Sequence, residues 1–375
     1  MVDFSPDLFM DAVLAYQQTA AIKAALELDL FSEIGKGNGT AEALAGTTGA
    51  AVRGVRILCD YLTARGHLEK QGDQYRLTQS TAAFLDRRSP SWTGSVVEYL
   101  AAPEMMALFL DDPGAFVRNG GSIGLANNAP NHPIWVKFAR AMGPSRVPLA
   151  TKIASELAVT SPRKVLDVAA GHGMFGIAIA RAVADAQITA VDWPAVLSVA
   201  RENADAAGVS ERYHTVRGSA FDTDWGSGFD LVLLANFLHQ LDRDGCVTLH
   251  RKARRSLVSE GRAVAIEFLL NEDRVSPRFS AMFAFQMLGS TPHGEAYTAR
   301  EFEDMGRAAG FARDREAVAT HYAKPHPVRA GMTCSGEQAP YEQPQADSVP
   351  SLPCRRCSPH VPFAKLEMLM AERPW

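Results

Sequence analysis

The chain has 375 residues, of which 47% are hydrophobic and 21% are charged, proportions typical of globular proteins. Its formal net charge of −4 gives no electrostatic reason to expect nucleic-acid binding. The opening residues, MVDFSPDLFM, do not resemble a secretory signal, and no apolar run approaches the ~18 residues that a membrane helix needs. Five scattered cysteines fit a reducing compartment. We therefore expect a cytoplasmic protein with no membrane contact and with room for two domains.

Residues 1–90 predict a helical domain that ends in a small β-hairpin. Thr40 has the character of a helix N-cap for Ala41–Ala45, and a second amphipathic helix is expected over Val52–Ala64. Leu68–Leu77 contains two short β-type segments around a Gly-Asp turn. This order of elements is typical of a winged helix, a module that either dimerises or binds DNA. The arginines of the second helix form no dense basic cluster, which favours packing or dimerisation.

Residues 91–150 predict helices that connect this domain to the next one and line a substrate cleft. Glycine and proline turns interrupt them. Phe138 and Met142 stand at helical spacing with Trp135. Each of them is a candidate for a substrate wall, with plain core packing as the competing interpretation.

The stretch Lys164–Ala180, KVLDVAAGHGMFGIAIA, organises the rest of the chain. Its apolar start predicts a buried strand, its Gly-His-Gly a tight turn, and its end a helix. Glycine lets a ligand approach the backbone closely in such a turn. The third glycine of the dinucleotide fingerprint GxGxxG is missing.

From residue 151 to residue 323, strands and helices alternate. Such alternation predicts an α/β, Rossmann-like, doubly wound and mainly parallel sheet. Gly208 and Gly261 are expected just after helices, at C-cap positions. The strands are expected at Val165–Val168, Ile188–Val191, Tyr213–Arg217, Phe229–Leu234 and Ala263–Leu270. The helices between them are expected at Phe175–Val183, Ala195–Ala207 and Cys246–Leu257.

Several candidate site residues stand where the predicted strands end. Asp192 ends the second strand, where a carboxylate can accept both hydroxyls of a ribose, and Trp193 beside it either stacks on an adenine or packs in the core. Asp167 either faces a ligand or bonds nearby backbone amides. His239 follows the fourth strand close to Asn236. Imidazole suits proton transfer near neutral pH, so we expect a general base there, and Glu267, at the end of the fifth strand, could orient it.

With these motifs in place, the chain resembles the small-molecule O-methyltransferases of the caffeic-acid and acetylserotonin type. The resemblance extends from about Leu8 to Ala319. It implies a winged-helix dimerisation domain, a Rossmann-like domain that binds S-adenosylmethionine, and a homodimer formed through the N-terminal domain. Its most specific segments are LDVAAGHG at Leu166–Gly173, AVDWPAV at Ala190–Val196, LLANFLHQLD at Leu233–Asp242, GRAVAIEFLLNEDR at Gly261–Arg274 and MLGSTPHGEAYTAREFEDMGRAAGF at Met287–Phe311.

Site residues follow from this resemblance position by position. His239 is the expected base and Glu267 its orienting acid. The expected cofactor contacts are Asp167, Ala169, Gly171, Gly173, Asp192, Trp193, Ser219, Ala220, Phe221 and Asn236. The expected acceptor-lining residues are Phe138, Met142, Phe237, Met282 and Phe285. No metal site is expected.

The chain departs from the family pattern at several places. Ser219 stands where an acid near the adenine amine is common, Gln240 follows the base in place of an acid, and Glu295 lies near the position of a second acid. Residues 324–375 are rich in proline and are expected to be mostly irregular. We interpret them as an atypical tail, foreign or altered in frame, that lacks a good central strand. Its CxxC at Cys354 and Cys357, with Cys334 and His360 nearby, is a weak zinc pattern.

These features predict transfer of a methyl group from S-adenosylmethionine to a hydroxyl of a small acceptor, aromatic or polyketide-like. Two alternatives stay open. One is a nicotinamide-dependent oxidoreductase, and the other is a winged-helix regulator that senses a small ligand.

Overall fold

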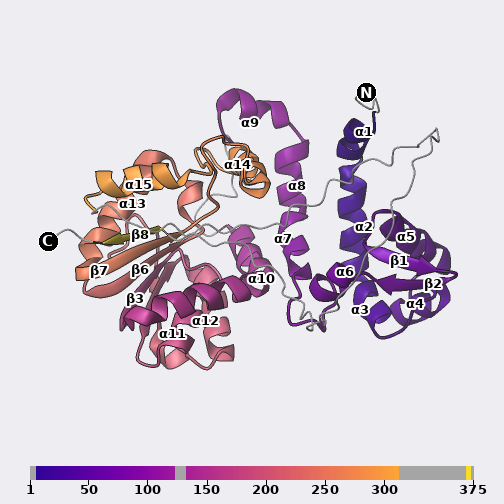
Figure 1. Cartoon of the computed structure of the whole chain (residues 1–375), viewed down its shortest axis with the longest axis horizontal. Coiled ribbons are helices and arrows are strands. Elements are labelled where there is room, and N and C mark those ends of the chain that lie inside the picture. Colours follow the sequence, from indigo (N-terminus) through magenta and orange to yellow (C-terminus); the bar gives the residue numbers. More distant parts are fainter. Residues whose placement is uncertain (1–5, 123–131, 312–368, 373–375) are drawn as a thin grey trace, which may run out of the picture.

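The computed structural model describes residues 6–122, 132–311 and 369–372. A helical N-terminal domain and an α/β domain lie on opposite sides of a set of connecting helices (Figure 1). Among the described residues, no helix has both the length and the apolar character that a membrane crossing requires.

The N-terminal domain is a helical bundle with a two-stranded antiparallel wing. Its hairpin pairs Leu68 with Leu77 and Gln71 with Gln74, as the sequence predicted. Thr40 caps α4 through a 3.1 Å bond from the Ala43 N–H. The elements are α1 (Asp7–Val13), α2 (Ala15–Glu27), α3 (Leu30–Gly35), α4 (Ala41–Thr48), α5 (Val52–Ala64), β1 (Leu68–Gln71), β2 (Gln74–Leu77) and α6 (Gln79–Phe84).

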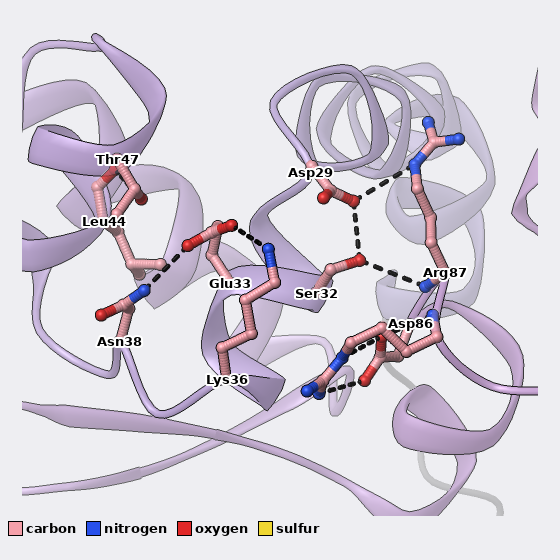
Figure 2. A network of polar contacts seen from close by, with 10 residues as sticks. Asp29, Ser32, Glu33, Lys36, Asn38, Leu44, Thr47, Asp86 and Arg87 are labelled. Carbon is pink, nitrogen blue, oxygen red and sulfur yellow. Dashed lines mark hydrogen bonds and ion pairs between the residues drawn. The ribbon is translucent and has the colours of Figure 1, made fainter.

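A polar network ties α3 to the chain that follows α6 (Figure 2). Ser32 donates to Asp29 at 2.7 Å and accepts from the Arg87 N–H at 3.1 Å. Asp86 receives two bonds from the Arg88 guanidinium, at 3.0 and 2.7 Å. Two arginines of the winged-helix region are also paired within the domain: Arg56 bonds to Asp60 and Arg65 bonds to Asp11.

The connecting helices are short except for the last. They are α7 (Val97–Leu100), α8 (Pro103–Leu110), α9 (Pro113–Asn119) and α10 (Pro133–Leu157). Helix α10 continues seven residues beyond position 150, so the connecting segment and the α/β domain share one continuous helix. Its apolar residues pack against both α11 (Met174–Ala182) and α12 (Pro194–Ala206).

The α/β domain is built on a sheet with strand order β5-β4-β3-β6-β7-β8 among the described residues. Strands β3 to β7 run parallel, and β8 runs antiparallel to β7. This is the predicted doubly wound sheet. The strands are β3 (Lys164–Val168), β4 (Gln187–Asp192), β5 (Tyr213–Arg217), β6 (Phe229–Ala235), β7 (Leu257–Ile266) and β8 (Leu369–Glu372).

Apolar side chains cover the sheet on both faces, because each buried strand presents alternate residues to opposite sides. Val165 and Leu233 face a core that α10, α11 and α12 complete. Leu166 and Leu234 face a second core, completed by α13 (Arg243–Ser256) and α15 (Ala299–Ala308). Gly208 follows α12 with φ +70°, as predicted for a C-cap position.

The beginning of β7 differs from the prediction. Helix α13 ends at Ser256 and the strand starts at once with Leu257, so Gly261 lies inside the strand and does not cap a helix. A Cβ on Gly261 would lie 2.8 Å from the Phe229 carbonyl oxygen. The glycine is needed for close approach to β6, where the strand register shifts.

Four residues of the tail form β8, whose Leu369–Glu372 pairs with Ala265–Arg262 of β7. The outer edge of β7 is therefore paired over these positions. The rest of the proline-rich segment, including the four cysteine and histidine positions considered for zinc, lies outside the described residues.

Candidate active site

The turn after β3 carries an unusual series of backbone conformations. Ala169, Gly171 and Gly173 all have positive φ, at +52°, +56° and +76°. Gly173 has no room for a side chain, because a Cβ there would lie 2.6 Å from the Tyr213 hydroxyl oxygen and 3.0 Å from Ala200 Cβ. The turn is thereby pressed against β5 and α12, and its main chain is held at the carboxyl edge of the sheet.

Asp192 lies beside this turn and is bonded to it. Its Oδ2 accepts from the Gly171 N–H at 2.8 Å, and its Oδ1 accepts from the Trp193 N–H at 2.7 Å. Burial raises the pKa of Asp192 to about 6, against the effect of these two donors. The carboxylate thus stands in a poorly hydrated place, next to the turn, at the position predicted for a ribose contact.

Asp167 has a more structural environment. Its side chain is buried, and Oδ2 accepts from the Gly176 N–H at 3.1 Å, in the first turn of α11. Burial raises the pKa of Asp167 to about 7. Its contact corresponds to the alternative interpretation given above, in which the acid bonds nearby backbone amides.

The loop after β5 contains three of the expected cofactor contacts, Ser219, Ala220 and Phe221. The Ser219 hydroxyl accepts from the Phe221 N–H at 3.0 Å, so Ser219 shapes its own loop. Ala220 is buried, whereas Phe221 is 40% exposed. Trp193, just after β4, is half-buried and packs against the cluster formed by Ala139, Val196 and Val199.

The segment after β6 presents the predicted base. Asn236 has φ +51° and donates from both its backbone and its side chain to the Ile266 carbonyl, at 2.8 and 3.0 Å. These bonds tie the segment to the end of β7. The short 3-10 helix η5 (Leu238–Gln240) then carries His239, whose side chain is buried.

Glu267 fixes this segment from the next strand end. Its Oε1 accepts from the N–H groups of Phe237 and Leu238 at 2.8 and 2.7 Å, and its Oε2 lies 2.5 Å from His239 Nδ1. With the carboxylate on that side, Nδ1 carries the proton of the neutral ring. Nε2 is then the nitrogen that can accept a proton. The structure brings together the histidine and the acid that the sequence paired.

Two aromatic rings lie against the histidine, and neither was predicted from the sequence as part of the site. Phe283 of α14 (Arg278–Ser290) meets the imidazole edge to face, with ring centres 4.8 Å apart. Phe268 lies 6.2 Å from it and carries the Arg146 guanidinium over its ring at 5.6 Å. Helical spacing of Phe279, Phe283 and Met287 is the signal that could have selected this face of α14.

The residues expected to line the acceptor site occupy different surroundings. The ring of Phe138 is near the glycine turn, 3.8 Å from the place a Cβ would take on Gly171. Met142 is buried among the connecting helices, and Phe237 is packed against the second core. Met282 and Phe285 are 60% and 52% exposed. Phe285 contacts Phe109 and Phe116 by its ring and does not contact His239.

A tight turn after α14 contacts the main chain of His239. The Glu295 N–H donates to the His239 carbonyl at 2.9 Å, and a Cβ on Gly294 would lie 2.4 Å from that same oxygen. The Glu295 side chain bonds to Arg274 at 2.6 Å. Its carboxylate is therefore engaged by an arginine, and Glu295 supports His239 through its backbone.

These residues fit the cofactor that the sequence predicted. Asp192 accepts one N–H on each oxygen from the described residues, and a carboxylate has lone pairs left for the two hydroxyls of a ribose. The main chain of the turn is free of bulky side chains at Gly171 and Gly173. Because β3 and β6 are paired neighbours, with Val168 beside Leu234, their carboxyl ends place this turn and the His239 segment at one edge. The fold and the site are those expected of a Rossmann-like methyltransferase.

Comparison with known proteins gives the family. An O-methyltransferase domain model matches residues 122–312, and an O-methyltransferase dimerisation domain model matches residues 10–87. The chain belongs to the S-adenosylmethionine-dependent O-methyltransferase family, with both of its characteristic domains.

Individual relatives agree with this assignment. A putative O-methyltransferase from Nostoc punctiforme has a similar structure, with TM-score 0.82 and 38% identity, covering 98% of this chain and 99% of that one. The structure titled PigF with SAH gives TM-score 0.73 at 25% identity, over 84% and 96% of the two chains. Among curated proteins, 3-hydroxy-5-methyl-1-naphthoate 3-O-methyltransferase of Streptomyces sahachiroi is 29% identical over 83% of this chain and 90% of its own length.

Proposed function

We propose that this enzyme methylates a hydroxyl of a small aromatic acceptor, with His239 as the general base. The observation that carries the proposal is the 2.5 Å contact between His239 Nδ1 and the buried Glu267, at the same sheet edge as the glycine turn. When bound, S-adenosylmethionine supplies an electrophilic methyl group on a positively charged sulfur.

His239 would take the proton of the acceptor hydroxyl at Nε2. As that proton arrives the ring becomes an imidazolium, and the carboxylate of Glu267 stabilises the new charge through Nδ1–H. Glu267 also keeps the ring in one tautomer and, through the N–H groups of Phe237 and Leu238, holds the backbone of the segment. A positioned base of this kind contributes typically ~10²–10⁴-fold in rate, and alignment of the reacting groups contributes further.

Asp192 and the turn from Ala169 to Gly173 would hold the cofactor's ribose and methionine portions. Ser219, Ala220 and Phe221 would lie toward the adenine, with Phe221 the most accessible of the three. The bond from the Asn236 side chain to the Ile266 carbonyl uses one amide N–H. The second N–H and the amide oxygen would remain for a contact with the cofactor.

The acceptor class follows from the aromatic side chains that surround the base. Phe268, Phe279 and Phe283 form a cluster of rings with centres 4.4 to 6.4 Å apart, and Phe283 touches the imidazole. Flat aromatic acceptors pack well against such rings. The relative from Streptomyces sahachiroi is named for a hydroxynaphthoate, so hydroxynaphthoates are suitable first probes.

The test is methyl transfer from labelled S-adenosylmethionine to a panel of hydroxynaphthoates and simple phenols. With an accepted probe, H239A is expected to lose 10²–10⁴-fold in kcat while its affinity for S-adenosylhomocysteine stays within twofold. His250 offers a matched control. It is also buried, but its Nδ1 bonds to the Cys246 carbonyl within α13, so H250N should retain most activity. Near-normal turnover by H239A would remove the base from the mechanism.

Titration with NAD distinguishes the proposed methyltransferase from the alternative, a nicotinamide-dependent oxidoreductase. The proposal expects binding of S-adenosylhomocysteine and none of NAD.

We further propose that the enzyme is a homodimer through its N-terminal domain, which matches the dimerisation model. Helix α1 supports this, because the described part of the chain buries none of its residues. Its apolar residues Leu8, Phe9, Met10 and Val13 are 86%, 66%, 43% and 52% exposed, and a second copy could cover them.

A further inference from the structure

Lys252, on α13, holds the loop that follows β5. Its ammonium donates to three backbone carbonyls of that loop: Ala220 at 2.9 Å, Phe221 at 2.8 Å and Thr223 at 2.6 Å. It also lies over the ring of Trp225, 4.4 Å from its centre. An ammonium has three donors, so the carbonyls use its full hydrogen-bonding capacity.

The loop that Lys252 holds is a single compact unit. Within it the Ser219 hydroxyl accepts from the Phe221 N–H, and the Ser219 carbonyl accepts from the Thr223 N–H at 3.0 Å. Gly218, with φ +135°, has Thr223 Oγ1 only 2.3 Å from the place of a Cβ. The loop can turn this tightly only with glycine at its start.

This unit is bonded to the strand that carries the ribose acid. The Gly218 N–H donates to the Asp192 carbonyl at 3.0 Å. The position of Asp192 and the position of Phe221 are therefore coupled through the loop, and the ammonium of Lys252 fixes the far side of it.

The charge makes this clamp strong. Burial lowers the pKa of Lys252 from its usual range, which reflects a partly desolvated ammonium, and hydrogen bonds from a charged donor are stronger than neutral ones. One side chain satisfies three backbone carbonyls of the loop at once. A neutral side chain of the same length would leave them to solvent and release the loop.

We propose that Lys252 is a positioning residue for the cofactor: it holds the loop Gly218–Trp225 in the conformation that receives the adenine. The inference rests on the proposed placement of Ser219, Ala220 and Phe221 at the adenine. Ser219 stands where a carboxylate is common in the resembling enzymes, and its hydroxyl is used inside the loop, so a preformed loop replaces a charged contact as the source of affinity.

The experiment is a calorimetric titration of the full-length protein with S-adenosylhomocysteine. K252M keeps the length of the side chain and removes the three donors, and it should raise Kd at least tenfold. K252R keeps the charge and should restore part of the lost affinity. R255M is the matched control, because Arg255 is on the same helix. Lys252 and Arg255 both line a surface hollow of about 460 Å³. The Kd of R255M should stay within twofold of the original.

Hydrogen exchange distinguishes positioning from general destabilisation. In K252M the amides of Phe221 and Thr223 should exchange faster, while amides of β3 and α11 keep their protection. A Kd for K252M within twofold of the original, or loss of protection throughout the sheet, would overturn the assignment. If K252M does not fold, K252R decides: it must bind more weakly than R255M and show faster exchange confined to the loop.

The outcomes also separate this inference from the proposed function. An original protein that does not bind S-adenosylhomocysteine would refute the cofactor site and Lys252 with it. Tight binding by the original protein and by K252M alike would refute Lys252 alone. The role of His239 as the base is tested separately by the kcat of H239A, a variant whose affinity for S-adenosylhomocysteine should be unchanged.

Discussion

At the residue scale, burial changes the pKa of Asp192, the acid proposed to bind the ribose. Two backbone N–H groups favour its charged form, yet removal from water dominates and raises its pKa to about 6. The folded protein therefore binds a proton more readily than the unfolded chain between about pH 4 and pH 6. The contribution of Asp192 to the stability of the cofactor-free enzyme is therefore fully present below about pH 4 and is lost as pH rises from about 4 to about 6.

Cofactor binding should have the opposite pH dependence. A carboxylate accepts ribose hydroxyls better than a neutral acid, so affinity for S-adenosylhomocysteine should fall as pH falls below about 6. D192N should bind at least tenfold more weakly at pH 8, the loss of a charged acceptor being worth about 1.5–3 kcal/mol, and should lose most of the dependence between pH 5 and pH 7. Calorimetry over this range measures both effects. Asp167 also has a raised pKa, of about 7, and any dependence that it contributes is present in both proteins. Equal slopes in the two proteins would therefore contradict the role of Asp192.

At the element scale, the site depends on a turn that supports the short helix η5 from behind. Gly294 approaches the His239 carbonyl so closely that a methyl group cannot fit, and Thr291 Oγ1 lies equally close to the same place, at 2.4 Å. The clash of G294A involves backbone, which cannot rotate away. The turn is itself tied to the connecting region, because the Ser122 N–H donates to the Thr291 carbonyl at 2.9 Å.

G294A should lower the free energy of unfolding by about 1–3 kcal/mol, as overpacking typically does. Gly306 provides a control, because its replacement by alanine is expected to raise the free energy of unfolding. It lies inside α15 with nothing within 4 Å of a Cβ, so G306A should raise stability by about 0.5–1 kcal/mol through helix propensity. Denaturant unfolding of the three proteins tests this pair. A G294A variant as stable as the original would show that the turn can move away from His239.

At the scale of the whole molecule, α1 carries apolar side chains that the described residues of the chain leave exposed. Such surfaces usually mark an interface. The dimerisation domain that matches residues 10–87 begins within α1, and this overlap supports the proposal that α1 contributes to a dimer interface. The α/β domain with the proposed active site lies on the other side of the connecting helices (Figure 1), so the proposed dimer interface and the proposed active site belong to separate parts of the chain.

The combined variant L8E/F9E/V13E should convert the dimer to a monomer, because three charges would be buried without partners. Light scattering should give about twice the chain mass of 40.6 kDa for the original protein and about the chain mass for the variant. V159E is the control, since Val159 is 85% exposed and lies in the short helix after α10. A variant that stays at the mass of a dimer would place the interface elsewhere.

The sequence by itself determined the order of the elements and the position of the site along the chain. Apolar runs separated by helical periods predicted β3 to β6 within one or two residues, because periodicity is a local property of the chain. Since parallel strands end at one edge, the same pattern predicted that Asp192, His239 and Glu267 would lie on the same side of the sheet.

Only the tertiary structure decided which of these side chains touch and what surrounds them. The contact of His239 with Glu267, the ring of Phe283 beside the base, and the clamp of Lys252 on a loop some thirty residues earlier all join segments that are distant in sequence. The same holds for Gly261, which looked like a helix end and lies inside β7 because β6 comes close. Local pattern fixes which way a strand faces, whereas the packing of strands and helices against one another fixes the distances on which the chemistry depends.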